Sequence, residues 1–335
     1  MTRRNMTSTR NLPLLLRPAF KDYIWGGSRL NDEYNLNIPV YPFAEAWVCS
    51  THPDGISTVP GMAEKSLTDV LLEHPEYLGT HPLEITDGKP ELPILIKLID
   101  AKKDLSVQVH PDDEYAAKHE NSRGKTEMWY ILKDSDEAEI VYGFRKDVTK
   151  DEVRASIDDG TIDTLLNHIP VRKNELYFIE SGTVHAIGAG CLIAEIQQSS
   201  NLTYRFYDYG RVDKNGKARP LHIDKALDVA NLSAVSVPRQ PMRVLKYTNG
   251  CAGELLSRCK YFQVERLLIN TEDRKLASFK TGRNSFHVLL CVDGCGDIFG
   301  DDFTLNFFKG DCIFVPAASI PLTIHGNAQL LNVSC

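Results

Sequence analysis

Gln108 and His110 lie two residues apart in the stretch DLSVQVHPDDEYA, which covers residues 104–116. In a β-strand, residues at positions i and i+2 point to the same face of the sheet. An amide and an imidazole on one face, directly before Pro111, fit an edge strand that enters a polar loop. They also fit half of a metal site, and residues elsewhere in the chain must decide between the two.

Glu127 and His185 are two further side chains of metal-ligand type on predicted strands. Glu127 opens the strand in GKTEMWYI, 17 residues after His110, and His185 follows the Gly turn of SGTVHAIG, 58 residues after Glu127. Two imidazoles, one carboxylate and one amide oxygen suit a divalent cation of the zinc type, with room for water or substrate. Each residue alone is more often hydrogen-bonded or solvated. The joint pattern of QxH, Glu and GTxHA resembles the metal-binding signature of cupin barrels, and it favours the metal site.

Other motifs in the chain do not support a competing cofactor site. RGKTE ends like a phosphate-binding P-loop, but His119 stands where the earlier glycine is required. GAG at 188–190 is too short for a dinucleotide fingerprint, and a hairpin turn is expected there. His52 is expected to be structural or to lie at a pocket rim. His287 and His325 have no Glu at ligand spacing, so no metal site is expected in the C-terminal region.

The candidate ligands lie among predicted strands, with helices inserted in two places. LPILIKLIDA, LSVQVH, TEMWYILK and EIVYGF have the apolar or alternating pattern of strands. Helical patterns cover 64–82, where Ser66 is a potential cap, and 147–168, where Thr149 and Glu152 form a capping-box pattern. HIDKALDVANL predicts a further helix.

Beyond about residue 235 the sequence becomes a series of short predicted strands, including NSFHVLLCVDG, CGDIFG, PLTIHG and AQLLNVS. Short strands separated by Gly and Asp turns are typical of a sandwich or jelly roll. We therefore expect a mainly β fold of two tandem cupin-like jelly-roll barrels, the first with helical insertions at about 61–90 and 147–170. The expected domains are a catalytic barrel at 1–235 and a metal-free C-terminal barrel at 236–335.

The composition is that of an ordinary globular protein and argues against several classes of function. The net charge is −7, no basic stripe of a nucleic-acid binder is present, and no apolar run approaches the length of a membrane span. The eight cysteines fit neither a CxxC pair nor a disulfide framework, which predicts free thiols and a cytoplasmic location. The start, MTRRNMTSTRN, lacks the apolar core of a signal peptide. A frayed start or a second initiation at Met6 is expected.

Eight segments follow one another in the order found in a known enzyme family: FKDYIWGG, EAWVCSTHPDG, LPILIKLIDA, LSVQVHPDDEYA, GKTEMWYIL, SGTVHAIGAG, EIQQSSNLTYRFYDYGR and LHIDKAL. From about residue 12 to its C-terminus the chain resembles the type I mannose-6-phosphate isomerases (phosphomannose isomerases) in their short bacterial form, within the cupin superfamily. The resemblance is strongest from Lys97 to Arg211. It implies a zinc-dependent aldose–ketose isomerase of mannose metabolism, with one Zn²⁺ per chain, that interconverts mannose 6-phosphate and fructose 6-phosphate.

The resemblance also implies roles for individual residues. The family's metal ligands fall on Gln108, His110, Glu127 and His185. Its active-site arginine falls on Arg205, its active-site lysine on Lys125, and further pocket positions on Lys97, Ser106 and Glu195. The implied partner is a sugar phosphate, with no nucleic acid and no membrane, and the chain is expected to be a monomer or a weak dimer.

Isomerisation through an enediol needs a base near the carbon proton, a positive centre at the developing oxyanion, and cations for the phosphate. The sequence leaves the base open: Glu195, a perturbed Lys125 and a water on the metal are all candidates. Glu195 could instead only orient Arg205 or a lysine. Arg205 and Lys125 can serve either the enediolate or the phosphate. Ser106 can hydrogen-bond the substrate or simply face a polar interior.

Two other functions fit the same fold. An iron oxygenase would need two His and one carboxylate with open positions and no dedicated phosphate cations. Gln108 and the cationic residues disfavour it; these are Lys97, Lys125 and Arg205. A non-enzymatic sugar-phosphate sensor would be favoured by the loss of a metal ligand, and all four candidate ligands are present.

Overall fold

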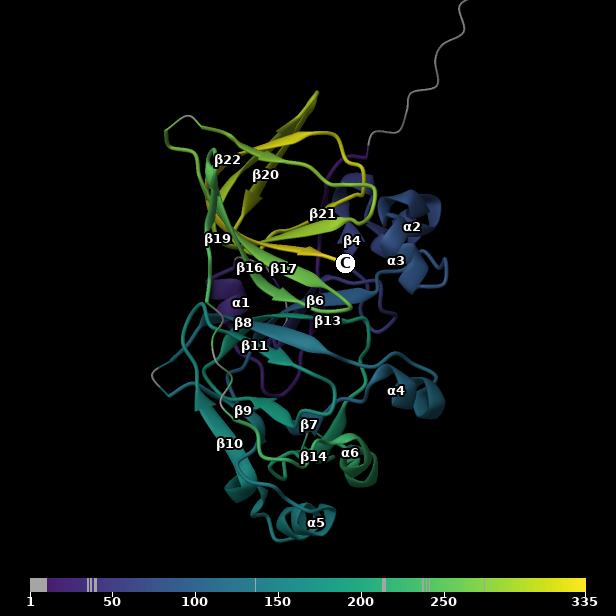
Figure 1. Cartoon of the computed structure of the whole chain (residues 1–335), viewed down its shortest axis with the longest axis vertical. Coiled ribbons are helices and arrows are strands. Elements are labelled where there is room, and N and C mark those ends of the chain that lie inside the picture. The colour runs from purple at the N-terminus through teal and green to yellow at the C-terminus, as the bar shows by residue number, and fades with distance from the viewer. Residues whose placement is uncertain are drawn as a thin grey trace, which may run out of the picture. The chain divides into compact units, whose positions relative to one another are not determined.

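The computed structural model of the chain describes residues 11–335, except 35, 37, 39, 40, 136, 213, 214, 237, 239, 241 and 274. The fold is mainly β, as the strand-rich sequence predicts (Figure 1). The expectations for the first ten residues, including Met6, lie outside the described residues. In the described part of the chain, no helix combines the length and the apolar character needed to cross a membrane.

The chain divides into two units that are each discontinuous in sequence. Unit 2 comprises 18–56 and 94–242, and unit 1 comprises 57–93, 243–335 and the segment that ends at Arg17. This division differs from the expected single boundary near residue 235. Residues 57–93 belong with the C-terminal residues because backbone hydrogen bonds join them: Phe286 N donates to Leu78 O at 3.0 Å, and Ala317 N donates to Tyr77 O at 2.8 Å.

Unit 2 contains two antiparallel sheets. The six-stranded sheet has the order β11 (Leu176–Ile179), β8 (Glu127–Lys133), β13 (Leu192–Gln198), β6 (Ile94–Asp100), β3 (Glu45–Cys49) and β2 (Ala19–Lys21). The five-stranded sheet has the order β10 (Leu166–Pro170), β9 (Glu139–Phe144), β12 (His185–Ile187), β7 (Val107–Val109) and β14 (Tyr204–Tyr207).

Successive strands of unit 2 often belong to different sheets. β6 is followed by β7, and β12 by β13, in the opposite sheet in each case. The hairpin predicted at 188–190 is therefore wrong: the GAG segment links β12 to β13, which do not pair with each other. The glycines still serve a turn, since Gly190 has a φ of +90°.

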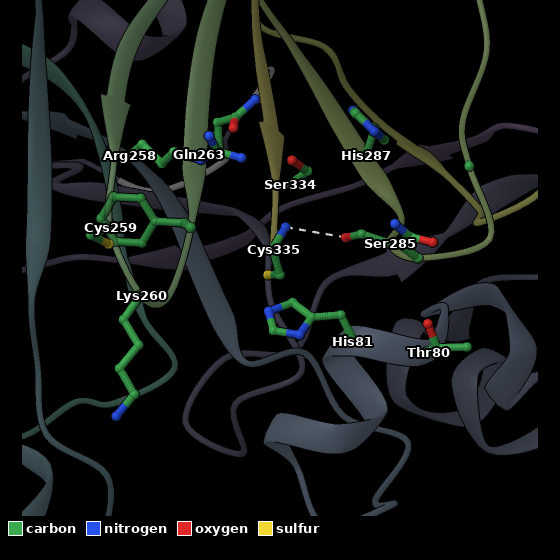
Figure 2. Close-up of a pocket in the computed structure, with 13 residues that line it drawn as sticks. Thr80, His81, Arg258, Cys259, Lys260, Gln263, Ser285, His287, Ser334 and Cys335 are labelled. Atoms are coloured by element: carbon green, nitrogen blue, oxygen red, sulfur yellow. Dashed lines mark hydrogen bonds between the residues drawn. The ribbon is translucent and has the colours of Figure 1, made fainter.

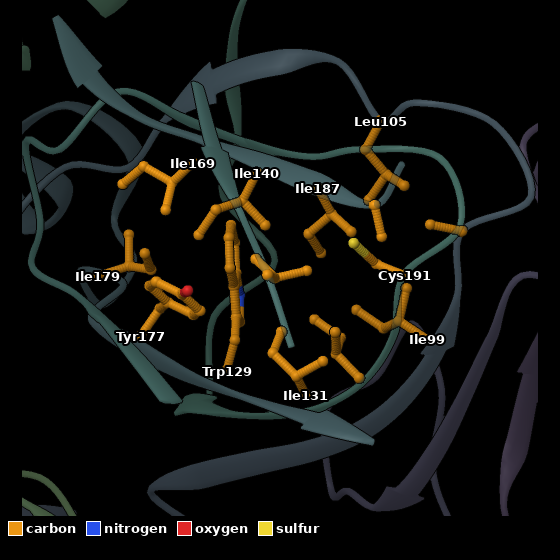
Figure 3. Packing of buried hydrophobic residues seen from close by; sticks show 14 of the residues in the cluster. Ile99, Leu105, Trp129, Ile131, Ile140, Ile169, Tyr177, Ile179, Ile187 and Cys191 are labelled. Atoms are coloured by element: carbon orange, nitrogen blue, oxygen red, sulfur yellow. The ribbon is translucent and has the colours of Figure 1, made fainter. Parts of the chain in front are cut away.

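The main core of unit 2 collects apolar side chains from both sheets. Figure 3 shows Trp129 of β8 at the centre of a cluster that includes Ile140 of β9 and Tyr177 of β11. A second cluster contains Val107 and Val109, as the alternation in LSVQVH predicts. The two valines pack into this apolar cluster, so the residues that alternate with them are free to line a polar cavity.

The helices of unit 2 are short, and two of them, α4 and α5, begin at side-chain caps. They are α1 (Arg29–Asp32), α4 (Asp113–Glu120), α5 (Lys150–Asp158) and α6 (Ile223–Val229), with a 3₁₀ turn at Ile162–Leu165. The capping box predicted before α5 is confirmed. Glu152 N donates to Thr149 Oγ1 at 3.1 Å, and Thr149 N donates to Glu152 Oε2 at 2.8 Å. Asp112 caps α4, directly after the predicted ligand segment.

Unit 1 is built on one large antiparallel sheet. Its order is β1 (Leu14–Leu16), β21 (Cys312–Val315), β19 (His287–Gly300), β22 (Leu322–Ser334), β17 (Gln263–Asn270), β16 (Cys251–Arg258) and β15 (Lys246–Thr248), with β18 (Ala277–Phe279) on β22 and β20 (Phe303–Phe308) on β19. The remaining elements are β4 (Thr58–Val59), β5 (Lys65–Ser66), α2 (Leu67–Glu73), α3 (Thr80–Ile85) and 3₁₀ turns at Pro60–Met62 and Pro75–Tyr77. The Ser66 cap is confirmed, since its hydroxyl accepts from Asp69 N at 3.0 Å.

Two pairs of predicted short strands prove to be single long ones. HVLLCVDG and CGDIFG form the continuous β19, and LTIHG and AQLLNVS form β22. The glycines in these segments do not end the strands. Gly294 has a φ of +76°, and a Cβ there would lie 2.0 Å from Asn327 O. Glycine at position 294 therefore allows the backbones of β19 and β22 to approach each other closely, so the long strands continue past it.

Candidate metal centre

Three predicted ligands meet between the two sheets of unit 2. Glu127 is the first residue of β8 in one sheet. His185 is the first residue of β12 in the other sheet, where it pairs directly with Gln108 of β7. His110 follows β7 immediately, before Pro111. Strand pairing thus brings together residues that lie far apart in the sequence.

The geometry of this cluster is that of a preformed cation site. His110 Nε2 lies 3.5 Å from Glu127 Oε2, and His185 Nε2 lies 3.5 Å from Glu127 Oε1. One ligand atom from each of the three side chains lies within 4.8 Å of the other two. All three side chains are at most 1% exposed. In the described part of the chain, this is the one such group of His, Cys, Asp and Glu residues.

Polar atoms in the cluster are buried without hydrogen-bond partners. Both ring nitrogens of His110 and both carboxylate oxygens of Glu127 are in this state, although Glu127 Oε2 forms an ion pair with Lys125 Nζ. Leaving a buried polar atom unpaired costs about 1–3 kcal/mol, and more for a charged group. His185 Nδ1 lies 2.8 Å from Thr183 O, so Nδ1 donates and the Nε2 lone pair points towards Glu127. An imidazole lone pair that faces a carboxylate repels it, and a cation bound between the two would remove this repulsion.

The protonation states agree with a ligand set. Burial lowers the pKa of His110 to about 3, and the charge of Lys125 acts in the same direction. Burial likewise lowers the pKa of His185. Burial opposes ionisation of Glu127, but Lys125 and His110 hold its pKa well below the usual range. Two neutral imidazoles and one carboxylate are the forms that bind a divalent metal, and the donor set fits zinc.

Gln108 lies beside this cluster with its amide nitrogen turned inward. Gln108 Nε2 is 3.4 Å from His185 Nε2, while Gln108 Oε1 accepts from Ser106 Oγ at 3.3 Å. A half-turn of the amide would exchange the two atoms and place the oxygen next to His185. The Ser106 hydroxyl could then accept from Nε2, so both orientations keep its contact. The role of Gln108 as a ligand stays a prediction.

A cavity of about 160 Å³ adjoins the cluster. It is lined by all five of the other predicted site residues, namely Lys97, Ser106, Lys125, Glu195 and Arg205. Gln108 and Lys125 connect the cavity with the metal cluster, since both line it and Lys125 Nζ lies 3.1 Å from Glu127 Oε2. His52, which the sequence predicts to be structural or to lie at a pocket rim, packs edge-on against Trp47 with ring centroids 5.7 Å apart.

Lys97 and Glu195 form a buried ion pair on the cavity wall. They lie opposite each other on β6 and β13, and Lys97 Nζ is 2.8 Å from Glu195 Oε2. Trp129 Nε1 donates to Glu195 Oε1 at 3.1 Å, which ties the pair to the apolar core. Burial and the charge of Glu127 raise the pKa of Glu195. Burial disfavours the ammonium form of Lys97, yet Glu195 and Glu45 hold its pKa above the usual value.

Arg205 and Arg219 both face the cavity. Asp208 holds Arg219 in a bidentate pair, accepting from Nε at 2.8 Å and from Nη2 at 2.6 Å. Burial and the nearby Arg219 lower the pKa of Arg205, and its Nε is buried without a hydrogen-bond partner. Two adjacent guanidinium groups, one of them with an unused buried donor, provide a site for an anionic group.

Several residues of the cavity escaped the sequence prediction. They are Tyr23, Trp25, Glu45, Ile99, Leu105, Ile187, Asn201, Thr203 and Arg219. Arg219 lies in the segment after β14, which has no strand or helix periodicity. The available signal was the concentration of basic residues in YGRVDKNGKARP, close in sequence to Arg205.

Comparisons with known proteins place this site in a family. The model of the type I phosphomannose isomerase catalytic domain matches residues 14–141, and the mannose-6-phosphate isomerase cupin domain matches 253–335. The chain is 36% identical over 321 residues to mannose-6-phosphate isomerase ManA of Bacillus subtilis, covering 95% of this chain and 98% of that protein. It is 42% identical over 222 residues to mannose-6-phosphate isomerase of Streptococcus mutans, covering 66% of this chain and 68% of that protein.

A solved structure agrees with these relatives. The crystal structure of mannose 6-phosphate isomerase from Bacillus subtilis superimposes with a TM-score of 0.86 at 36% identity, covering 96% of this chain and 99% of that one. The fold and the cluster define a cupin-containing isomerase with a metal-type site. The chain belongs to the type I mannose-6-phosphate isomerase family and is an enzyme of that activity. The comparisons support neither an oxygenase nor a non-catalytic sensor.

Proposed function

We propose that the chain interconverts mannose 6-phosphate and fructose 6-phosphate as a zinc-dependent enzyme, by proton transfer through an enediol. The observation that carries this proposal is the buried cluster of His110, Glu127 and His185, whose unpaired polar atoms adjoin a cavity with four cationic side chains. Gln108 is proposed as the fourth ligand. Zinc, when bound, would supply positive charge for the oxygen that becomes anionic as the enediol forms.

Glu195 is the best-supported group for the proton transfer between C2 and C1. It lines the cavity, and its raised pKa brings the carboxyl closer to the value that suits a general base. Lys97 orients the carboxylate through the 2.8 Å ion pair. Lys125 lies between the metal cluster and the cavity, where its ammonium group can donate to a substrate oxygen. Ser106 lines the same wall and can hydrogen-bond the sugar.

Arg205 and Arg219 are proposed to hold the substrate, with Arg219 directed at the phosphate. A phosphate dianion accepts bidentate hydrogen bonds from guanidinium groups. Asp208 fixes the orientation of Arg219 and is itself buried. Preorganisation of this kind reduces the ordering cost when the anion binds.

Substituting Arg219 tests the phosphate contact. We expect Arg219→Ala to raise KM for mannose 6-phosphate by about tenfold and to change kcat by less than threefold, because a binding contact of roughly 1.5 kcal/mol is lost in both the ground and transition states. Steady-state kinetics provide the measurement, with unphosphorylated mannose as a second substrate. Arg172→Ala, at an exposed arginine of the same unit, is the matched control. A fall in kcat at unchanged KM, or an equal loss with mannose, would contradict the phosphate role.

Metal removal tests the proposed function directly. Prolonged treatment with a chelator should reduce turnover of mannose 6-phosphate at least tenfold, and added Zn²⁺ should restore it in proportion to the metal bound. Elemental analysis gives the zinc content, and a coupled assay for fructose 6-phosphate gives the rate. Full turnover in a fully metal-free sample would rule out metal dependence.

We further propose that the two units are tandem cupin-like jelly-roll barrels, with the catalytic site in unit 2 and no metal in unit 1. The two family-model matches at 14–141 and 253–335 support this arrangement. A cytoplasmic location is also proposed, and it is supported by all eight cysteines being free. The expected monomer or weak dimer remains a prediction.

A further inference from the structure

A second cavity, of about 700 Å³, lies wholly within unit 1. It is formed by the turn between β16 and β17, the residues that open β19, the start of α3 and the end of β22 (Figure 2). Cys335 N donates to Ser285 Oγ at 3.1 Å, which fixes the end of β22 at the cavity. A volume of this size is in the range of small-molecule sites.

The charge of this cavity is opposite to that of the chain. None of its 13 lining residues is Asp or Glu, whereas Arg258 and Lys260 both line it. The whole chain carries a net charge of −7. The nearby Glu265 is held by hydrogen bonds from Gln263 Nε2 at 3.2 Å and Asn332 Nδ2 at 3.0 Å. Figure 2 shows the Lys260 side chain directed away from Arg258, so Arg258 is the cation that can attract an anion to the cavity. The Arg258 guanidinium makes no hydrogen bond or ion pair with any described residue, so its donors are available to a ligand.

His287 gives the cavity a group that recognises hydroxyls. Asn332 Nδ2 donates to Glu265 Oε2 at 3.0 Å, so its Oδ1 is the atom that accepts from His287 Nδ1 at 2.8 Å. This relay leaves His287 Nε2 as the unprotonated nitrogen of the ring. Burial lowers the pKa of His287 and keeps the ring neutral. A neutral Nε2 accepts a hydrogen bond from a hydroxyl and has no attraction for an anion.

The two ends of the cavity therefore suit two different groups of one ligand, an anionic group at Arg258 and a hydroxyl at His287. We propose that this cavity binds a phosphate monoester of a polyol or sugar, with the phosphate at Arg258 and a hydroxyl at His287. The planar fork of donors on Arg258 suits the oxygens of a phosphate. The buried ring of Phe262 offers an apolar surface for the carbon chain. The site is separate from the isomerase cavity, which consists of unit 2 residues alone.

Calorimetric titration of the zinc-loaded enzyme with glucitol 6-phosphate tests this site, because that compound has no carbonyl and is not turned over. We expect two molecules bound per chain in the wild type. Arg258→Glu should weaken the binding of one of them at least tenfold, and Arg219→Ala should weaken the binding of the other about tenfold. Lys275→Ala, at an exposed lysine of unit 1 outside the cavity, should leave both.

Unchanged turnover of mannose 6-phosphate by Arg258→Glu would show that the variant is folded, and Arg258→Gln, which removes the charge without reversing it, provides a second route to the same test. Binding of one molecule per chain in the wild type would overturn the proposal, as would two molecules in both Arg258 variants. Gluconate bound at the Arg258-dependent site as tightly as glucitol 6-phosphate would overturn the assignment to phosphate esters. Failure of any of these leaves the isomerase proposal intact, because its own tests concern unit 2.

Discussion

His110→Ala should abolish zinc binding and reduce turnover of mannose 6-phosphate by a factor on the order of 10³ or more. The expected size follows from the several kcal/mol of charge stabilisation that a bound metal supplies to a developing oxyanion. Both ring nitrogens of His110 are buried without a hydrogen-bond partner among the described residues, so the substitution removes no such bond. The measurement is zinc per chain by elemental analysis, together with the rate of fructose 6-phosphate formation.

A matched control for this substitution is His119→Ala. His119 is an exposed histidine of α4, stacked on Tyr115 with ring centroids 4.2 Å apart. Its removal should leave both zinc content and turnover within twofold of the wild type. If His110→Ala kept its zinc and its rate while folding normally by circular dichroism, the assignment of the metal site would be wrong.

Arg205→Ala should lower kcat by about 10²–10³-fold while zinc remains bound. Removing one preorganised donor to a developing oxyanion typically has an effect of this size. Arg205 is poised for such a role because its Nε is buried without a partner and its side chain lines the cavity beside Gln108. Steady-state kinetics and zinc analysis on the same sample separate a catalytic effect from loss of the metal.

Two further variants sharpen this test. Arg205→Lys keeps the charge but loses the planar fork of donors, so we expect part of the rate to return. Arg154→Ala removes an exposed arginine that pairs with Asp224 at 2.5 Å on the surface, and it should behave as wild type. A normal kcat in Arg205→Ala would remove the catalytic role, whereas loss of zinc would reassign Arg205 to support of the metal site.

The sequence predicted those parts of the site that depend on local pattern. Alternation in LSVQVH correctly separated Val107 and Val109, which lie in an apolar cluster, from Ser106 and Gln108, which line the cavity. Alternation succeeds because it follows from the geometry of a strand alone. The Gly turn of SGTVHAIG then brought His185 into the same set, and the pairing of His185 with Gln108 shows why residues so distant in the sequence meet.

The features that the sequence did not reveal depend on which strands pair. The contacts of Glu195 with Lys97 and Trp129 follow from the position of β13 between β6 and β8. A single sequence does not specify that order, because many pairings satisfy the same alternation. Arg219 was missed for a related reason, since its position is set by Asp208 and not by any regular element. The orientation of the Gln108 amide depends on a hydrogen bond, which pattern cannot show.

The chain crosses from one unit to the other four times. This has a consequence for its biosynthesis. Every proposed metal ligand and all the strands of unit 2 lie before residue 208, so unit 2 can close while later residues are still being added. The sheet of unit 1 can be completed only after the last strands are synthesised, because Leu14 of β1 pairs with Phe314, which lies near the other end of the chain. Contacts of such long range form slowly. A ribosome-bound chain that ends shortly after unit 2 should therefore already retain zinc, while its β1 strand still lacks its partner.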